Sequence, residues 1–407
     1  IEKVTIVRGI PTVEYGDLTS GLVLIERKKG AAPFTLRAKT DGFGKLFALS
    51  KGYAFKDSLF VNADLGYLTG VAKPTNSFEN FKRATGSIRM DKTKKKKNRL
   101  NWKSAFDYST TLDNEKTDPD NSYIATDNYY ARKQSFALNN KFSLRFKNPW
   151  VDELELTSKF SYQKDIVDED RWIQASTATI LIISLAAGSH EAQFLTPSYV
   201  SNLRIDGQPL TAYHKLTSTH SYSYKQTKHK FKFGVESNFY KNFGQGQVYD
   251  LDYPPAAIIT ARPRSFTSIP GFHSLAGFAE DHFTWNINKT MLEAYVGIRA
   301  FSNSSLDAKY SMSNKIYTEP RTNLRIHFPA IYIAGKPLKT TFGGGIGLLK
   351  KNPTLDHFYP NLSYRDIVEL NFFHNNPAYR MAQAYTNIID PTNYNLVPAT
   401  NLKKELN

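Results

Sequence analysis

The sequence has no cysteine among its 407 residues, and it has no long apolar run. The first absence excludes disulfides and thiolate metal sites. It also suits a chain that crosses an oxidising compartment without mispairing. The longest apolar stretch, ATILIISLAAG at residues 178–188, is shorter than the roughly 18–20 residues that a membrane-spanning helix needs. A transmembrane helix is therefore not predicted.

The charge balance is strongly basic, with a formal net charge of +16 and a sequence pI of about 9.5. Two basic runs, at residues 27–29 and 92–97, lie where predicted strands end. We interpret them as solvated turn residues that protect strand edges. A nucleic-acid surface needs aromatic side chains within the basic run, and KTKKKKN has none. No nucleic-acid partner is predicted.

Aromatic residues are abundant, and apolar residues alternate with polar ones along many segments. The 27 Phe and 24 Tyr favour half-buried, pleated surfaces. In ELELTSKFSYQ, Leu154, Leu156 and Phe160 alternate with Glu155 and Lys159. The same period of two recurs at residues 98–109, 231–240, 292–300 and 321–328. Each of these segments predicts a strand with one apolar face and one polar face.

The links between the predicted strands alternate in length. Short links near residues 54–58, 91–97, 147–152, 225–228, 287–290 and 329–337 alternate with links near 72–77, 111–126, 166–208, 244–271, 305–318 and 347–400. Tight turns on one side and long loops on the other are typical of an outer-membrane barrel. A soluble sandwich has no reason to sort its loops in this way.

The predicted fold class is therefore all-β, a transmembrane antiparallel up-and-down β-barrel. We expect about thirteen strands between Phe34 and Ile346, with apolar faces toward lipid and charged faces toward a wet lumen. The mean hydropathy of −0.45 agrees with this, because a barrel turns only every second residue to lipid. The residues predicted to face the lumen are Lys103, Lys159, Lys232, Glu236, Arg299 and Arg325.

Other chemical motifs are weak. In FGGGIGLLKKNPT neither Lys350 nor Lys351 follows a glycine, so a phosphate-binding loop is not predicted and a curved strand is. The nine histidines lack metal-ligand spacing, and no nucleophile elbow occurs. The acidic stretch at residues 165–171 is interpreted as a solvated outer loop, with cation binding as the alternative. We predict no enzyme activity, no cofactor and no metal site.

The first thirty residues, IEKVTIVRGIPTVEYGDLTSGLVLIERKKG, resemble the end of the plug domain of TonB-dependent outer-membrane receptors. A second resemblance, to the middle of the barrel of that family, runs through EPRTNLRIHF, FGGGIGLLKKNPTLDHFYPN and TNYNLVPATNLKKELN. The positions that match the plug pattern are Ile1, Glu2, Val4, Ile6, Arg8, Gly9, Tyr15, Gly16, Gly21, Leu22, Ile25 and Lys29.

The resemblance implies a plugged barrel of the 22-stranded type. Residues 1–30 would be the C-terminal part of the plug, and residues 31–407 a partial barrel with long extracellular loops. The early plug before Ile1 and about nine strands after Asn407 would then be absent. The residues implied to act in the plug turn and in gating are Arg8, Gly9, Tyr15, Gly16 and Gly21.

The implied function is TonB-dependent uptake of a scarce solute, a siderophore, glycan or peptide, across the outer membrane of a Gram-negative bacterium. The implied partners are the TonB energy-transducing complex, outer-membrane lipid and an unknown small solute. The style of EYGDLTSG resembles receptors from the Bacteroidetes. Receptors with a surface lipoprotein lid usually carry Leu-Lys-Asp-Ala-Ser where this chain has VRGIPT, which argues against a dedicated lid.

Two other classes remain open at this point. A passive porin or adhesin-like barrel would show a constitutive conductance without energy coupling. A soluble all-β carbohydrate-binding protein or hydrolase would bury Leu100, Trp102, Phe106 and Phe160 in a sandwich core.

Overall fold

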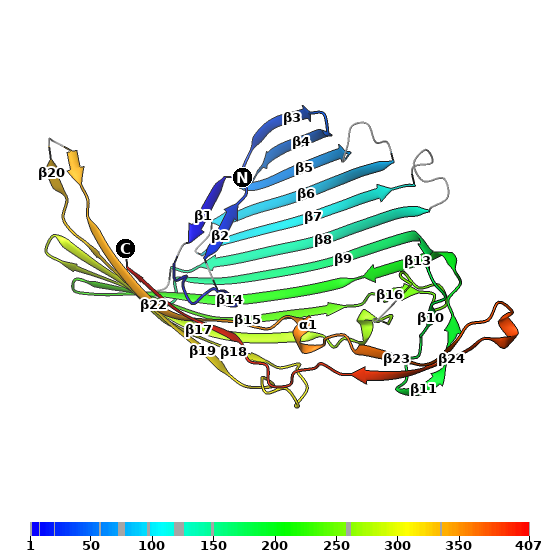
Figure 1. Cartoon of the computed structure of the whole chain (residues 1–407). Coiled ribbons are helices and arrows are strands. Elements are labelled where there is room, and N and C mark those ends of the chain that lie inside the picture. Colours follow the sequence, from blue (N-terminus) through cyan, green and yellow to red (C-terminus); the bar gives the residue numbers. More distant parts are fainter. Residues whose placement is uncertain are drawn as a thin grey trace.

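The computed structural model describes residues 2–7, 9–19, 21–56, 58–71, 78–95, 98–117, 126–147, 150–257, 262–333 and 336–406. One large antiparallel sheet dominates it, in which strands that follow one another along the chain lie side by side (Figure 1). The strands along this sheet are β3 (Ala32–Thr40), β4 (Gly44–Phe55), β5 (Leu59–Gly70), β6 (Glu79–Lys95), β7 (Arg99–Glu115), β8 (Asp127–Arg145), β9 (Glu153–Gln174), β14 (Pro209–Tyr224), β15 (Thr227–Asn242), β17 (Phe272–Ile287), β18 (Thr290–Asn303), β19 (Tyr317–His327), β22 (Thr341–Lys351) and β25 (Ala399–Leu406).

These boundaries agree with the predicted up-and-down order. Thirteen strands of this path lie between Ala32 and Lys351 in the described part of the chain, and β25 adds another. Residues 225–226 separate β14 from β15, whereas residues 243–271 separate β15 from β17. The predicted link at 72–77 lies outside the described residues. The prediction of a loop at residues 165–171 is wrong, because β9 continues through them and pairs there with β8 and with β13 (Ser198–Gly207).

The remaining elements lie mostly in the long connections. A three-stranded sheet, in the order β11–β24–β23, lies at the end of the molecule opposite to the hairpin β20–β21 (Figure 1). These elements are β10 (Ile180–Leu181), β11 (Gly188–Glu191), β12 (Gln193–Phe194), β16 (Gly246–Tyr249), η1 (Phe266–Ser268), β20 (Ile331–Ile333), β21 (Lys336–Leu338), α1 (Leu355–Phe358), β23 (Ser363–Phe372), η2 (Pro377–Tyr379) and β24 (Met381–Ile389). In the described residues no helix is both long and apolar enough to cross a membrane.

The apolar faces of the strands are exposed instead of forming a core between two sheets. Phe106 is 43 % exposed, Phe160 is 44 % exposed and Leu100 is 38 % exposed. The buried apolar clusters lie in the long connections, for example around Met312 and Phe358. A soluble sandwich would bury the strand residues, so the exposed strand faces contradict that alternative.

Candidate functional site

Residues 9–19, named here the inner segment, lie between the hairpin strands β1 (Lys3–Val7) and β2 (Leu22–Glu26) and contact distant parts of the large sheet. The backbone N–H of Val13 donates to Glu280 on β17 at 3.0 Å. Asn323 on β19 donates to the carbonyl of Ile10 at 3.2 Å, and Lys403 on β25 donates to that of Gly9 at 2.8 Å. One short segment reaches all three strands because the sheet curves around it, so these side chains mark the inner face of the sheet.

Glu14 is the ionic centre of the inner segment. Its carboxylate accepts hydrogen bonds from Lys215 on β14 at 2.7 Å and from Lys232 on β15 at 2.6 Å. Burial alone would raise the pKa of Glu14, but the charges and hydrogen bonds of Lys232 and Lys215 outweigh it and lower that pKa below its ordinary value. Lys215 also lies 5.1 Å from the ring centre of Tyr15, a cation–π distance.

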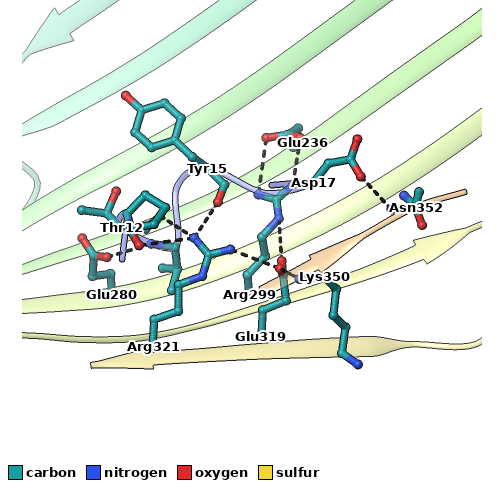
Figure 2. A network of polar contacts seen from close by, with 12 residues as sticks. Thr12, Tyr15, Asp17, Glu236, Glu280, Arg299, Glu319, Arg321, Lys350 and Asn352 are labelled. Atoms are coloured by element: carbon teal, nitrogen blue, oxygen red, sulfur yellow. Dashed lines mark hydrogen bonds and ion pairs between the residues drawn. The ribbon is translucent and has the colours of Figure 1, made fainter. Parts of the chain in front are cut away.

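Arg321 on β19 holds the backbone of the inner segment. Its Nη1 donates to the carbonyls of Thr12 at 2.9 Å, Tyr15 at 2.7 Å and Pro11 at 3.3 Å (Figure 2). The residue is only 3 % exposed. The planar guanidinium presents several donors at fixed angles, which a flexible ammonium does not. Arg321 therefore fixes the shape of the turn as well as its position.

Two glutamates balance this arginine and a second one. Arg299 on β18 donates to Glu236 on β15 at 2.8 Å and lies 3.6 Å from Glu319 on β19. Glu319 is fully buried, and it accepts from Arg321 at 3.2 Å and from the backbone of Lys350 at 2.7 Å (Figure 2). Buried charges are tolerated only when paired and hydrogen-bonded. Pairing each arginine with glutamate stabilises this network on the inner face of the large sheet. That sheet is called the wall below.

Glycines on both the inner segment and the wall allow the two to approach closely. A Cβ on Gly16 would overlap the guanidinium of Arg299. On the wall, a Cβ on Gly297 would come within 2.8 Å of Val13, and one on Gly347 within 2.8 Å of Ile10. Val13 is fully buried there. The glycine-rich strand β22 thus lets the apolar side of the inner segment lie directly on the wall.

The far end of the inner segment reaches the long connection after β22. Asp17 accepts a hydrogen bond from the backbone N–H of Asn352 at 2.8 Å, and Asn401 donates to the carbonyl of Thr19 at 3.2 Å. A cavity of about 430 Å³ opens beside this contact. Its lining includes Asp17, Glu236, Tyr240, Phe272, Arg299, Phe301, Lys351 and Asp356. The inner segment, the wall and the connection after β22 therefore all line this cavity.

The predicted plug-turn residues have different positions. Gly9, Tyr15 and Gly16 belong to the inner segment, with Gly9 at φ +85 against Glu405. Gly21 is exposed directly before β2. Arg8 lies outside the described residues.

The predicted lumen residues divide into three groups. Lys232, Glu236 and Arg299 belong to the network described above. Lys103 and Lys159 line a separate cavity of about 440 Å³ with the basic residues that follow β2. Arg325 is half-exposed, 4.0 Å from Glu293. The structure brings the first group together and leaves the other two apart from it.

The sequence analysis did not single out several residues that bind the inner segment to the wall or support those contacts. They are Glu14, Lys215, Glu280, Glu319 and Arg321. Glu14 adjoins the Tyr15–Gly16 pair of the plug-like motif. Arg321 lies on the polar face of a predicted strand. The motif position of Glu14 and the strand face of Arg321 could therefore have marked both residues as candidates from the sequence. Neither signal says which residue of the segment meets which residue of the wall.

No protein-family profile and no curated protein sequence matches this chain. Solved structures do match it. The RagAB peptide transporter aligns at a TM-score of 0.52 and 10 % identity, over 89 % of this chain and 42 % of that one. The ferric-catecholate import receptor Fiu from E. coli K12 aligns at 0.50 and 9 % identity, over 89 % and 60 %. The copper transporter OprC aligns at 0.49 and 13 % identity, over 95 % and 61 %.

The chain has the barrel fold of TonB-dependent outer-membrane receptors, which confirms the predicted fold class and the recognised resemblance at the level of fold. This is a fold of the outer membrane of Gram-negative bacteria, in agreement with the predicted location. The chain spans less than two thirds of the length of each of these three proteins.

Proposed function

We propose that this chain is part of a TonB-dependent receptor that takes up a scarce solute through a plugged barrel. Residues 1–30 are the last part of the plug in this proposal, and residues 31–407 are barrel wall and outer loops. The observation that carries the proposal is the docking of the inner segment, with Glu14 between two lysines and Arg321 on three carbonyls. A passive pore has no need for a segment bound across its lumen in this way.

The geometry suggests how such a segment moves under force. The segment contacts the wall through hydrogen bonds and ion pairs and through the apolar packing of Ile10 and Val13. The wall groups Glu236, Glu319 and Arg299 are paired with one another and not with the segment. Pulling on the segment separates Glu14 from Lys215 and Lys232, whereas the pairs that Arg299 makes with Glu236 and Glu319 stay within the wall. We propose that TonB, acting on the plug, supplies this force. No covalent step is involved.

The solute class stays open between a siderophore, a glycan and a peptide. The neighbours include a peptide transporter and a ferric-catecholate import receptor by name, and neither name decides the solute of this chain. The cavity beside Asp17 carries aromatic, acidic and basic groups together. A surface lipoprotein lid is left out of the proposal.

Uptake by whole cells tests the proposal. Wild-type cells and cells lacking the gene are grown in the same complex medium, each with and without functional TonB, and the solutes that disappear from the medium are compared. The proposal expects at least one solute whose depletion needs both the gene and TonB. Depletion that needs the gene but is unaffected by loss of TonB would favour the passive porin.

Conductance of the intact protein in planar bilayers gives an independent test. A barrel closed by its inner segment is expected to conduct little without applied force, whereas a porin conducts constitutively. A large steady conductance from the wild-type protein would contradict the proposal.

A further inference from the structure

A row of lysines crosses the inner face of the wall, as the strand register shows. Lys215 on β14 contacts Glu14, so it faces the inner segment. Side chains that are opposite one another in neighbouring strands point to the same side of a sheet. Lys215 is opposite Thr157 on β9, which is opposite Lys141 on β8. Lys141 is opposite Lys103 on β7. The inner face therefore carries three lysines along one line across the sheet.

Two of these lysines border a cavity of about 440 Å³, named here the basic cavity. The wall contributes Lys103, Lys141 and Lys159 to its lining, and the residues after β2 contribute Lys28 and Lys29. Lys159 is two positions along β9 from the line described above, so it shares the inner face. The ammonium groups of a single cavity therefore come from both the hairpin β1–β2 and the wall.

Carboxylates neutralise only part of the charge around the basic cavity. The arginines of the lining are paired with aspartates, and Lys141 is paired with Glu155 at 2.6 Å. In the described part of the chain the other lysines of the lining form no ion pair with a carboxylate; they are Lys28, Lys29, Lys103 and Lys159. Lys103 is opposite Lys141 on one side and Asp91 on the other, and like charges in opposite positions destabilise a sheet. An anionic ligand would stabilise this excess of positive charge.

Glu14 shows which chemistry the inner face binds. Its carboxylate accepts hydrogen bonds from two ammonium groups, those of Lys215 at 2.7 Å and Lys232 at 2.6 Å. Lys215 lies on the same line across the sheet as Lys103. An ammonium group has three donors and binds carboxylate and phosphate oxygens alike. The lysines of the basic cavity that form no ion pair are therefore suited to the kind of group that Glu14 presents to the end of the row.

We propose that the basic cavity binds a solute with at least two carboxylate or phosphate groups, and that the solute taken up belongs to this acidic class. This inference rests on the proposed function, which puts the cavity on the path of the solute. Two anionic groups are inferred because the lysines without an ion pair lie on two sides, Lys103 and Lys159 on the wall and residues 28–29 after β2. Asn139 and Thr157, also in the lining, offer neutral hydrogen bonds to the same solute.

The basic cavity lies toward the end of the sheet that carries the short links. Lys103 is near the start of β7 at Arg99, directly after one of these links. In barrels of this fold the long loops face the outside of the cell, and the short turns face the periplasm. A solute that enters between the long loops therefore meets the basic cavity after it has passed the inner segment. The cavity acts in passage and not in the first capture of the solute.

Calorimetric titration of the intact protein in detergent tests the binding. The probes are citrate, a tricarboxylate, and inorganic pyrophosphate, which distinguish carboxylate from phosphate recognition, with glycerol as a neutral control. Lys103→Gln and Lys159→Gln each remove one ammonium group from the cavity. Lys164→Gln is the matched control, an exposed lysine on the other face of β9. We expect at least one probe to bind the wild type, about tenfold weaker binding in each cavity variant, and wild-type affinity in the control.

Three results of the titration would overturn the proposal. The first is that neither probe binds the wild type. The second is that both cavity variants bind as tightly as the wild type. The third is that Lys164→Gln weakens binding as much as they do, which would reduce the effect to net charge. Heat-modifiable migration of each variant shows that the barrel is still folded.

Uptake by whole cells separates this proposal from the proposed function. The proposal expects the solute whose depletion needs both the gene and TonB to be an acid. Lys103→Gln/Lys159→Gln should slow its uptake about tenfold, while binding of the solute to cells lacking TonB stays at the wild-type level. A neutral solute, or wild-type uptake by the double variant, would overturn the proposal and leave the proposed function standing. If no solute depends on TonB, the proposed function fails, and with it the claim about the class of solute taken up, while the titration still decides whether the cavity binds acids.

Discussion

Asp17 accepts a hydrogen bond from the backbone N–H of Asn352 at 2.8 Å, across a sequence separation of 335 residues. This bond joins the inner segment to the first residues of the long connection after β22. It lies at the border of the cavity that Asp17, Arg299 and Asp356 help to line. A solute that enters this cavity would therefore meet both partners of the bond.

The Asp17 bond can be removed without adding backbone strain. Asp17 has φ +59, a left-handed conformation that glycine adopts freely. We expect Asp17→Gly to increase hydrogen exchange at the amide of Asn352, and Asp17→Asn, which keeps an acceptor oxygen, to leave it protected. Equal exchange in the two variants would show that the bond does not hold the loop.

Glu14→Gln should loosen the inner segment. The substitution leaves two buried or half-buried ammonium groups without their counter-charge, and the loss of charged hydrogen bonds costs about 2 kcal/mol. We expect faster hydrogen exchange across residues 10–16 in the intact protein. Glu26→Gln, an exposed position on the same hairpin, serves as the control and should leave the exchange unchanged.

The same carboxylate predicts a pH dependence. The pKa of Glu14 lies below its ordinary value of 4.5 in the folded state, so its contribution is fully present above pH 4.5 and is lost as the pH falls through the lowered value. Protection of residues 10–16 against hydrogen exchange, corrected for intrinsic exchange rates, should be constant from pH 7 to 5. It should decrease when the pH is lowered below 4.5. The Glu14→Gln variant should show no such transition; an identical fall in both proteins would assign it to other groups.

Arg321→Lys tests whether geometry or charge holds the turn. Lysine keeps a positive charge but loses the guanidinium geometry in which Nη1 meets the carbonyls of Thr12 and Tyr15 while Nη2 meets Glu319. We expect a folded barrel with a higher leak conductance in planar bilayers than the wild type. Arg325→Lys, a half-exposed arginine on the same strand, should leave the conductance unchanged. A leak of equal size in both variants would count against a special role for Arg321.

Gly16→Ala tests the close approach of the segment to the wall. The new methyl group would overlap the guanidinium of Arg299, and overpacking of this kind costs about 1–3 kcal/mol. Gly42→Ala adds the same methyl group where no atom lies within 4 Å. We expect a lower unfolding midpoint in urea for Gly16→Ala only. Equal midpoints for the two variants would mean that Arg299 moves aside at no cost.

The sequence by itself determined the class of fold and the two faces of each strand. Alternation such as Leu154, Glu155, Leu156 can only be satisfied by a strand with one face in water and one against apolar surroundings. The order of short and long links then fixed an up-and-down sheet. These are local properties, set by a period of two and by turn length, and they need no knowledge of distant partners.

Only the tertiary structure decided which residues meet. Glu14 finds Lys215 across a separation of 201 residues, and Gly9 finds Lys403 across 394. Each strand shows its charged face to the segment only in the correct register, because a shift of one residue would send its side chains to the other face. Register and sheet curvature are global quantities, set by all strand pairings together. For that reason no single segment could reveal the ionic network around the inner segment.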